Sequence, residues 1–220
     1  MREQSAWQAI PSGGRHAAFD ISVGNDRCSG SYLVAQMRWA LDQFDTFEVS
    51  FADTLAVHTY MAVGHPVRGL LGESAAREVA LMEGSAWMDR NYGYIRDELP
   101  GGTRVTSWDR WMGLQPVQRN LAALRRACDN DVRLRGAIWS WIAIYLDRRK
   151  VNRSQLAPSA CSHLEQYVLE ELAVYQHQVE STNAINVYPG LDLATYDPLL
   201  RAPGLPAPLL HRHFVTLRMG

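Results

Sequence analysis

An abrupt change from a buried strand to a glycine-containing turn near residue 22 most constrains this chain. The mostly apolar run at 17–23 predicts a strand buried on both faces. It stops at Ser22-Val23-Gly24-Asn25, and a helical pattern begins near Tyr32. Open α/β sheets bind ligands at the carboxyl ends of their strands, so Ser22 is a candidate nucleophile and the turn N–H groups are candidate oxyanion donors. The alternative is a turn whose serine and asparagine only cap the backbone.

The rest of the chain alternates between helical and strand-like patterns. The expected helices cover 32–44, 74–92, 115–127, 132–146 and 161–178, and the expected strands cover 47–52, 104–107 and 184–188. This order predicts an α/β fold with a mainly parallel sheet flanked by helices, in a single domain over 1–220. Residues 1–14 and about 198–220 are expected to be peripheral tails. The four prolines from Pro198 to Pro208 predict an irregular wrap over the surface.

Composition excludes several classes of protein. A chain of 220 residues that is 47% hydrophobic suits one compact domain, and no apolar stretch is long enough to span a bilayer. The polar N-terminus does not resemble an export signal, and the three cysteines are widely separated, so we expect a cytoplasmic protein without disulfides. Phosphate-loop, dinucleotide and zinc-protease motifs are missing, and Ser22 is not in a GxSxG motif. We therefore expect neither a metal nor a cofactor.

Charge is distributed unevenly along the chain although the net charge is only −1. Residues 61–100 hold four arginines and six carboxylates, whereas 101–153 hold eleven basic residues and four carboxylates. Such an excess can attract phosphates, and the alternative is a solvated helix surface paired with scattered acids. The candidate phosphate-binding residues are Arg119, Arg125, Arg126, Arg133, Arg148, Arg149 and Lys150.

Two further segments carry candidate site residues. Tyr167 and Glu171 are four residues apart in an expected helix, so they share one face. A phenol and a carboxylate together can hold an ammonium group by charge-assisted hydrogen bonds, although an edge tyrosine beside solvated acids is the alternative. Tyr188 follows the last expected strand, where it can relay a proton or simply pack half-buried.

Taken in order, these segments resemble the cyclodipeptide synthases. That family has a strand ending in a Ser-x-Gly-Asn-like turn, then a helix with Tyr-x-x-x-Glu, and then a tyrosine at a strand end. Here the matching segments are Ser22-Val23-Gly24-Asn25, Tyr167-Val168-Leu169-Glu170-Glu171 and Asn186-Val187-Tyr188-Pro189. The resemblance spans about 15–189, most of the chain. It implies a Rossmann-like fold similar to the catalytic domain of a class I aminoacyl-tRNA synthetase.

The resemblance also implies a reaction. Two aminoacyl-tRNAs are the substrate partners, and their esters are already activated, so no ATP or metal is required. Ser22 attacks the first aminoacyl ester and carries first the aminoacyl and then the dipeptidyl group. Tyr167 and Glu171 hold the α-ammonium, with Glu171 able to handle a proton. Tyr188 assists proton movement as the amine closes the diketopiperazine ring.

Expected substrate-binding residues surround the candidate nucleophile: Ala18, Asp20, Gly24, Asn25 and Ser50. Asp20 departs from the family pattern, in which the residue two before the nucleophile is commonly small and lines the first side-chain pocket. A buried carboxylate needs a cation or good hydrogen bonds. We therefore expect a polar or basic first substrate, with arginine the leading choice, or else a carboxylate satisfied inside the protein.

Two other function classes remain open from the sequence. A non-catalytic module could bind tRNA through the basic segment without modifying Ser22. A serine acyltransferase or esterase could act on small esters without tRNA. For the synthase we expect a monomer or a weak homodimer.

Overall fold

The computed structural model describes residues 16–101, 103–189, 199, 201–210 and 214–217. Within them the strands form one five-stranded sheet, entirely parallel, in the order β3-β2-β1-β4-β5. The strands are β1 (His16–Ser22), β2 (Thr46–Ala52), β3 (Arg104–Ser107), β4 (Ile185–Pro189) and β5 (Phe214–Leu217). The predicted parallel sheet is confirmed. The expected tail at 1–14 lies outside the described residues.

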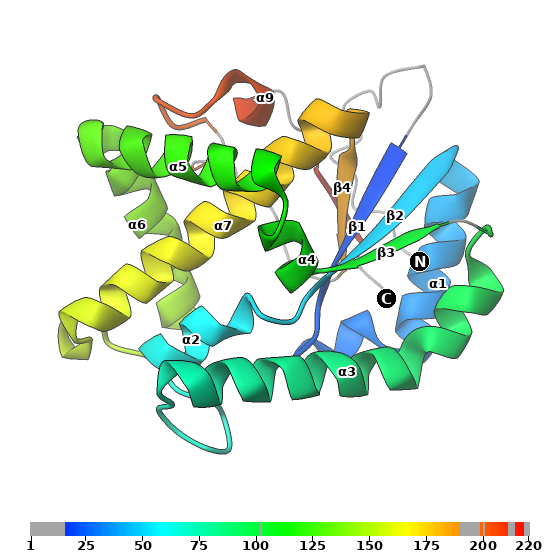
Figure 1. Ribbon diagram of the computed structural model, residues 1–220, viewed down its shortest axis with the longest axis horizontal. Coiled ribbons are helices and arrows are strands. Elements are labelled where there is room, and N and C mark those ends of the chain that lie inside the picture. The colour runs from blue at the N-terminus through cyan, green and yellow to red at the C-terminus, as the bar shows by residue number, and fades with distance from the viewer. Residues whose placement is uncertain (1–15, 102, 190–198, 200, 211–213, 218–220) are drawn as a thin grey trace.

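Helices pack on both sides of this sheet (Figure 1). They are α1 (Gly30–Gln43), α2 (Ala56–Ala62), α3 (Glu73–Glu98), α4 (Trp108–Met112), α5 (Gln115–Asn130), α6 (Val132–Arg148), α7 (Pro158–Thr182) and α9 (Ala207–Leu210), with short 3-10 turns at Asp26–Cys28 and Arg153–Gln155. In Figure 1, α1 lies on one side of the sheet and α5, α6 and α7 lie on the other.

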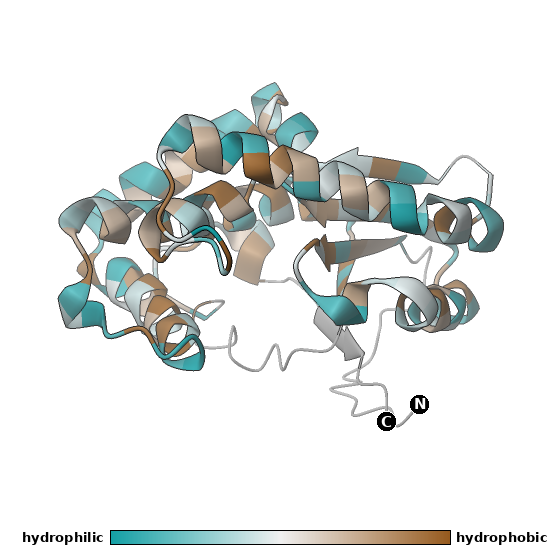
Figure 2. Ribbon diagram, turned by 90° about the horizontal axis from the view of Figure 1, so that it is seen from below, coloured by the Kyte–Doolittle hydropathy of each residue, from teal (hydrophilic) through white to brown (hydrophobic). Residues whose placement is uncertain are grey.

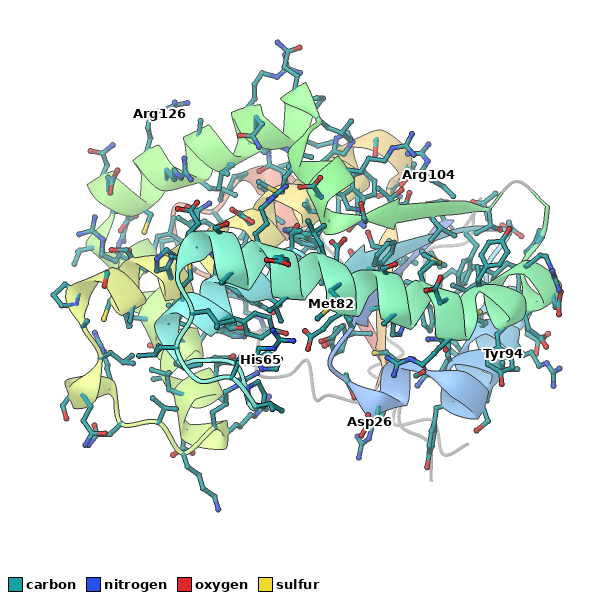
Figure 3. The ribbon with its side chains drawn as sticks, turned by 60° about the horizontal axis from the view of Figure 1, so that its bottom comes forward. Asp26, His65, Met82, Tyr94, Arg104 and Arg126 are labelled. Atoms are coloured by element: carbon teal, nitrogen blue, oxygen red, sulfur yellow. The ribbon has the colours of Figure 1, made fainter. Side chains whose placement is uncertain are left out.

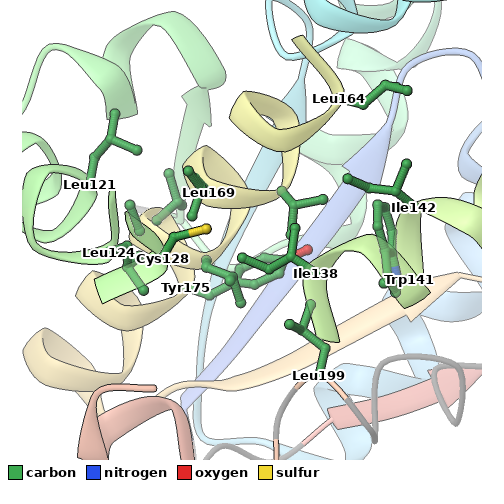
Figure 4. Close-up of a cluster of buried hydrophobic side chains, with 14 of the residues drawn as sticks. Leu121, Leu124, Cys128, Ile138, Trp141, Ile142, Leu164, Leu169, Tyr175 and Leu199 are labelled. Atoms are coloured by element: carbon green, nitrogen blue, oxygen red, sulfur yellow. The ribbon is translucent and has the colours of Figure 1, made fainter. Parts of the chain in front are cut away.

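The core consists of two large buried clusters. One joins β1, β2 and β4 to α1 and α3, with Phe19, Leu33 and Trp87 almost fully buried. The other joins α5, α6 and α7, where Leu124, Ile138 and the neighbouring side chains interdigitate (Figure 4). Figure 2 shows hydrophobic residues along the strands, while the long helices alternate between hydrophobic and hydrophilic positions. This pattern is expected of a sheet covered on both faces.

Three expectations from the sequence need correction. The helix expected to end at residue 92 continues to Glu98, because Ile95 and Leu99 pack into the core around the sheet. The segments that form α2 and α4 were not predicted as helices. The C-terminal tail is not wholly irregular, since it contains α9 and then β5, which pairs with β4. Phe, Val and Thr favour a strand there, but the segment is only four residues long and its pairing partner is distant in the sequence.

Helix α3 crosses the carboxyl ends of β1 and β2 (Figure 1). A Cβ atom added at Gly84 would lie 2.6 Å from Cβ of Asp53, which directly follows β2. The indole of Trp87, one turn further along α3, stacks on Phe51 with a centroid distance of 5.6 Å. Glycine at position 84 therefore sets how closely this helix approaches the strand ends.

We predict that Gly84→Ala lowers the free energy of unfolding by about 1–3 kcal/mol, because the added methyl group overpacks the contact with Asp53. Urea unfolding followed by tryptophan fluorescence measures this. The matched control is Gly93→Ala in the same helix, where no atom lies within 4 Å of the added Cβ. This control should gain up to about 1 kcal/mol from helix propensity. If both substitutions stabilised the protein equally, this would contradict the close contact between Gly84 and Asp53.

Candidate active site

A cavity of 630 Å³ opens at the carboxyl ends of the strands. Its walls come from the turn after β1, the end of β2, and helices α2, α3, α6 and α7, with Tyr188 from β4. The lining residues include Ser22, Gly24, Asn25, Arg27, Asp53, Leu55, Ala56, Tyr60, Ala80, Glu83, Trp141, Ile144, Tyr145, Arg148, Arg149, Tyr167 and Tyr188. The structure therefore brings Ser22, Asn25, Tyr167 and Tyr188 together, although 166 positions separate the first from the last.

The turn that carries Ser22 is tightly hydrogen-bonded. The N–H of Asn25 donates to the carbonyl of Ser22 at 3.1 Å, and the N–H of Cys28 donates to the carbonyl of Asn25 at 2.8 Å. The side-chain oxygen of Asn25 accepts from the N–H of Arg27 at 3.1 Å and caps the short 3-10 turn. Asn25 therefore fixes the backbone beside the hydroxyl of Ser22.

Helix α3 holds the far end of the same turn. The Asn91 side-chain oxygen accepts from the Ser29 hydroxyl at 3.0 Å and from the Gly30 N–H at 2.9 Å. The indole N–H of Trp87 donates to the carbonyl of Cys28 at 2.8 Å. Both α3 side chains are fully buried. Their bonds leave the connection between β1 and α1 little freedom, which favours a fixed position for Ser22.

Tyr188 lies against the candidate nucleophile. Burial raises the pKa of its phenol, and hydrogen bonds with the side chains of Ser22 and Asn25 oppose that rise. The phenol is therefore protonated at neutral pH and can exchange a proton with the Ser22 hydroxyl. Burial also raises the pKa of the nearby Cys28 thiol to about 12, which leaves that sulfur a poor nucleophile.

Tyr167 and Glu171 lie on the side of α7 that faces the cavity. Burial, followed by the charge of Glu171, raises the pKa of Tyr167 well above its ordinary value. Its ring stacks on Trp141 and Tyr145, at centroid distances of 6.0 and 6.3 Å. Glu171 is buried behind the lining and accepts a hydrogen bond from Tyr175 at 3.0 Å. A phenol in the wall with a carboxylate behind it can receive a cationic group.

A family model described as cyclodipeptide synthase matches residues 4–188. This chain belongs to the cyclodipeptide synthase family. It is thus an enzyme that forms cyclodipeptides, and the resemblance carried by its three motifs is confirmed. A search of curated proteins gave no match.

Solved cyclodipeptide synthases share this fold at low sequence identity. One from Fluoribacter dumoffii is 20% identical, with a TM-score of 0.73 over 93% of this chain and 89% of that one. One from Streptomyces noursei is 17% identical, with a TM-score of 0.71 over 94% and 96%. A Mycobacterium tuberculosis protein, described as showing that cyclodipeptide synthetases are related to type I tRNA synthetases, is 16% identical, with a TM-score of 0.70 over 92% and 84%. The synthetase-like fold expected from the sequence is confirmed.

The other expected substrate-binding residues of this synthase lie deeper than the cavity wall. Ala18 is fully buried, while Asp20 and Ser50 belong to a buried polar group with Gln178 of α7 and Asn186 of β4. The amide nitrogens of Asn186 and Gln178 donate to the Asp20 carboxylate at 2.6 and 3.4 Å, and Gln178 also donates to Ser50 at 3.3 Å. Neutral amides of this chain are thus among the partners of the Asp20 carboxylate.

The candidate phosphate-binding residues do not form one surface. Arg148 and Arg149 line the cavity, where the Arg149 guanidinium lies 5.1 Å from the Tyr145 ring centre. Arg125 of α5 donates to Gln166 at 2.7 Å, and Arg133 pairs with Asp131 at 3.3 Å. Arg119 and Lys150 are exposed. In Figure 3, Arg126 lies above α3 while Asp26 and His65 lie below it.

The polar lining residues that sequence reasoning missed include Arg27 in the turn after β1, Tyr60 and Glu83. Tyr60 belongs to α2, a helix too short to show a clear period, and Glu83 reads as one of several surface acids on α3. No local signal distinguishes Tyr60 and Glu83 from surface residues, because only the packing of α2 against α3 places their side chains at the cavity. Within the described residues no helix is long and apolar enough to cross a membrane.

Proposed function

We propose that this synthase uses two aminoacyl-tRNAs and carries the growing product as an ester on Ser22. The observation that carries the proposal is the position of Ser22 at the carboxyl end of β1, in a cavity that Tyr167 and Tyr188 also line. The ester of an aminoacyl-tRNA is activated, so the protein has only to position the groups and move protons. An enzyme that uses aminoacyl-tRNA works in the cytoplasm, and a single copy of the chain provides every proposed site residue.

In the first step the Ser22 oxygen attacks the carbonyl carbon of the first aminoacyl ester. The bond from that carbon to the tRNA ribose oxygen breaks, and the proton of the Ser22 hydroxyl passes to the departing ribose oxygen. Tyr188, which hydrogen-bonds to Ser22, is placed to relay this proton. The backbone N–H groups of Val23 and Gly24 in the adjoining turn are the proposed donors for the transient oxyanion.

In the second step the amine on the Ser22 ester attacks the second aminoacyl ester. The α-ammonium must first lose a proton, and Glu171, behind Tyr167, is the carboxylate placed to accept it. A peptide bond forms, the second tRNA leaves with a proton on its ribose oxygen, and a dipeptidyl ester remains on Ser22. The stacked rings of Tyr167, Trp141 and Tyr145 form the wall beside this amine.

In the third step the free amine of the dipeptide attacks the carbonyl carbon bound to Ser22. The second amide bond closes the diketopiperazine ring, and the bond to the Ser22 oxygen breaks. The proton lost by the amine returns to that oxygen, with Tyr188 as the relay. The cycle ends with the hydroxyl of Ser22 restored.

We predict that Ser22→Ala abolishes cyclodipeptide formation, because the ester intermediates cannot form. Tyr188→Phe should slow it by about 100-fold or more, the usual loss for a proton-transfer group. Mass spectrometry of medium from expressing bacteria measures both.

Ser31→Ala, an exposed serine of α1, is the matched control and should keep wild-type output. Full activity in Ser22→Ala would contradict the covalent mechanism. Soluble wild-type protein that hydrolyses model esters but makes no diketopiperazine would favour an esterase.

We further propose a polar or basic first substrate, with arginine the leading choice. The support is the Asp20 carboxylate, which is buried on the strand that ends at Ser22 and accepts from the amides of Gln178 and Asn186. A guanidinium that displaces these neutral donors forms charge-assisted hydrogen bonds instead.

We predict that Asp20→Ala shifts the product profile toward apolar residues, which mass spectrometry of the cyclodipeptides measures. Ser50→Ala, which removes a neutral member of the same polar group, is the matched comparison and should change the profile less. An unchanged profile in Asp20→Ala would overturn the proposed preference.

The basic residues are proposed to bind tRNA phosphates in two places. Arg148 and Arg149 line the cavity and suit the acceptor end, whereas Arg119, Arg125 and Arg126 of α5 suit a more distant part of the tRNA. Arg133 and Lys150 lie near the two ends of α6 and complete the proposed set. Bidentate guanidinium contacts favour phosphate over other anions.

We predict that the double substitution Arg148→Glu and Arg149→Glu weakens tRNA binding. The plot of the logarithm of the binding constant against the logarithm of the salt concentration should become less steep, by about 0.7–0.9 per lost phosphate contact. Filter binding at several salt concentrations measures this. Arg125→Glu with Arg126→Glu should act similarly, and exposed Arg90→Glu on α3 should not. Salt-sensitive binding that survives both double reversals would contradict the proposed contacts.

A further inference from the structure

The proposed reaction assigns no role to one part of the cavity wall. It is formed where α2 meets α3; its lining residues are Leu55, Ala56, Thr59, Tyr60, Ala80 and Glu83, and Asp53 at the end of β2 lines the cavity beside them. Glu83 is the charged residue that α2 and α3 contribute to this lining, and Asp53 is more deeply buried. Its side chain is 36% exposed, so the carboxylate is accessible from the cavity while its hydrogen bonds fix it in place.

Two neutral groups hold the Glu83 carboxylate. The Tyr60 hydroxyl donates to Oε2, and His65 lies with its Nε2 at 2.9 Å from Oε1. Burial, followed by the hydrogen bond to Glu83, raises the pKa of Tyr60, so this phenol remains a donor. A carboxylate held by neutral donors keeps its negative charge available to a ligand.

The loop around His65 fixes which ring nitrogen carries the proton. Nδ1 accepts from the N–H groups of Val67 and Arg68, each at 3.2 Å, so the proton lies on Nε2 and points at Glu83. The loop is closed by paired backbone hydrogen bonds between His65 and Gly69, at 2.7 and 2.9 Å. Gly69 has a φ of +71°, which favours glycine. The imidazole is therefore a preset neutral donor.

The surroundings of Glu83 suit an aliphatic stem that ends in a positive charge. Ala56 is partly exposed and, with the buried Leu55 and Ala80, gives this part of the wall a small or apolar lining in which the Glu83 carboxylate also lies. Long basic side chains bury their methylene groups against such surface while the charged end reaches a polar partner. An α-ammonium has no such stem, and it must stay close to the ester on Ser22.

We propose that Glu83, held by Tyr60 and His65, binds the cationic side chain of the second aminoacyl group. Guanidinium and ammonium groups are the chemical class that it selects. This inference rests on the proposed use of two aminoacyl-tRNAs. Arg148 and Arg149 line the same cavity, and the guanidinium of Arg149 stacks on the ring of Tyr145. Both arginines are the residues proposed above to bind tRNA phosphate.

The test compares arginine with citrulline, a neutral side chain of nearly the same shape, on the same tRNA. Purified full-length protein is first loaded with whichever aminoacyl group forms the ester on Ser22, and either second aminoacyl-tRNA is then added. Wild-type protein should use arginine about 10- to 100-fold faster than citrulline, the range expected for a hydrogen bond to a charged group. The wild-type comparison needs no variant, so misfolding cannot obscure it.

Glu83→Gln should bring the arginine-to-citrulline ratio close to one while the use of citrulline is retained. The matched control is Glu78→Gln, an exposed carboxylate on the same helix, which should keep the wild-type ratio. Equal use of both side chains by wild-type protein, or equal losses for both in Glu83→Gln, would overturn this inference alone. A wild-type protein that forms neither the Ser22 ester nor any cyclodipeptide would instead overturn the proposed function.

Discussion

The close packing of α3 across the carboxyl ends of β1 and β2 is the constraint on which the site depends. The absence of a side chain at Gly84 lets the helix backbone approach Asp53. Trp87 and Asn91 then reach the turn after β1 and bind its carbonyl, hydroxyl and N–H groups. A looser helix would leave these buried polar groups unpaired and release the turn that carries Ser22. The same helix places Glu83 in the cavity lining, so one packing contact positions both Ser22, the proposed nucleophile, and Glu83.

Helix α7 supplies the second half of the site. Its apolar residues pack against α5 and α6, and the same helix also buries the polar side chains of Glu171, Gln176 and Gln178. Buried polar groups need hydrogen-bond partners. Tyr175 donates to Glu171, and Gln178 is hydrogen-bonded to Asp20, Ser50 and Asn186. This arrangement places a carboxylate behind Tyr167 without exposing it to bulk water. It therefore favours proton exchange with a bound amine over exchange with solvent.

Much of the sheet could be predicted from the sequence because its signals are local. The apolar run before Ser22 and the alternation at 47–52 correspond to β1 and β2, and the short strand at Arg104–Ser107 was predicted with the bounds that the structure gives. By contrast, β5 forms only by pairing with β4. The partners of Asp20 could not be predicted either, since Gln178 and Asn186 lie about 160 positions away. The position of Glu83 and Tyr60 in the cavity lining could not be predicted either, because it results from the packing of α2 on α3.

The central claim is that Ser22 itself carries the aminoacyl group. The most direct measurement is tandem mass spectrometry of the protein after brief reaction with one aminoacyl-tRNA and an acid quench that preserves esters. We predict one added aminoacyl mass on the peptide containing Ser22, localised to that hydroxyl. An adduct on Cys28, whose buried thiol has a raised pKa, or on any other residue would contradict the account. So would cyclodipeptide formation by a protein that never acquires the added mass.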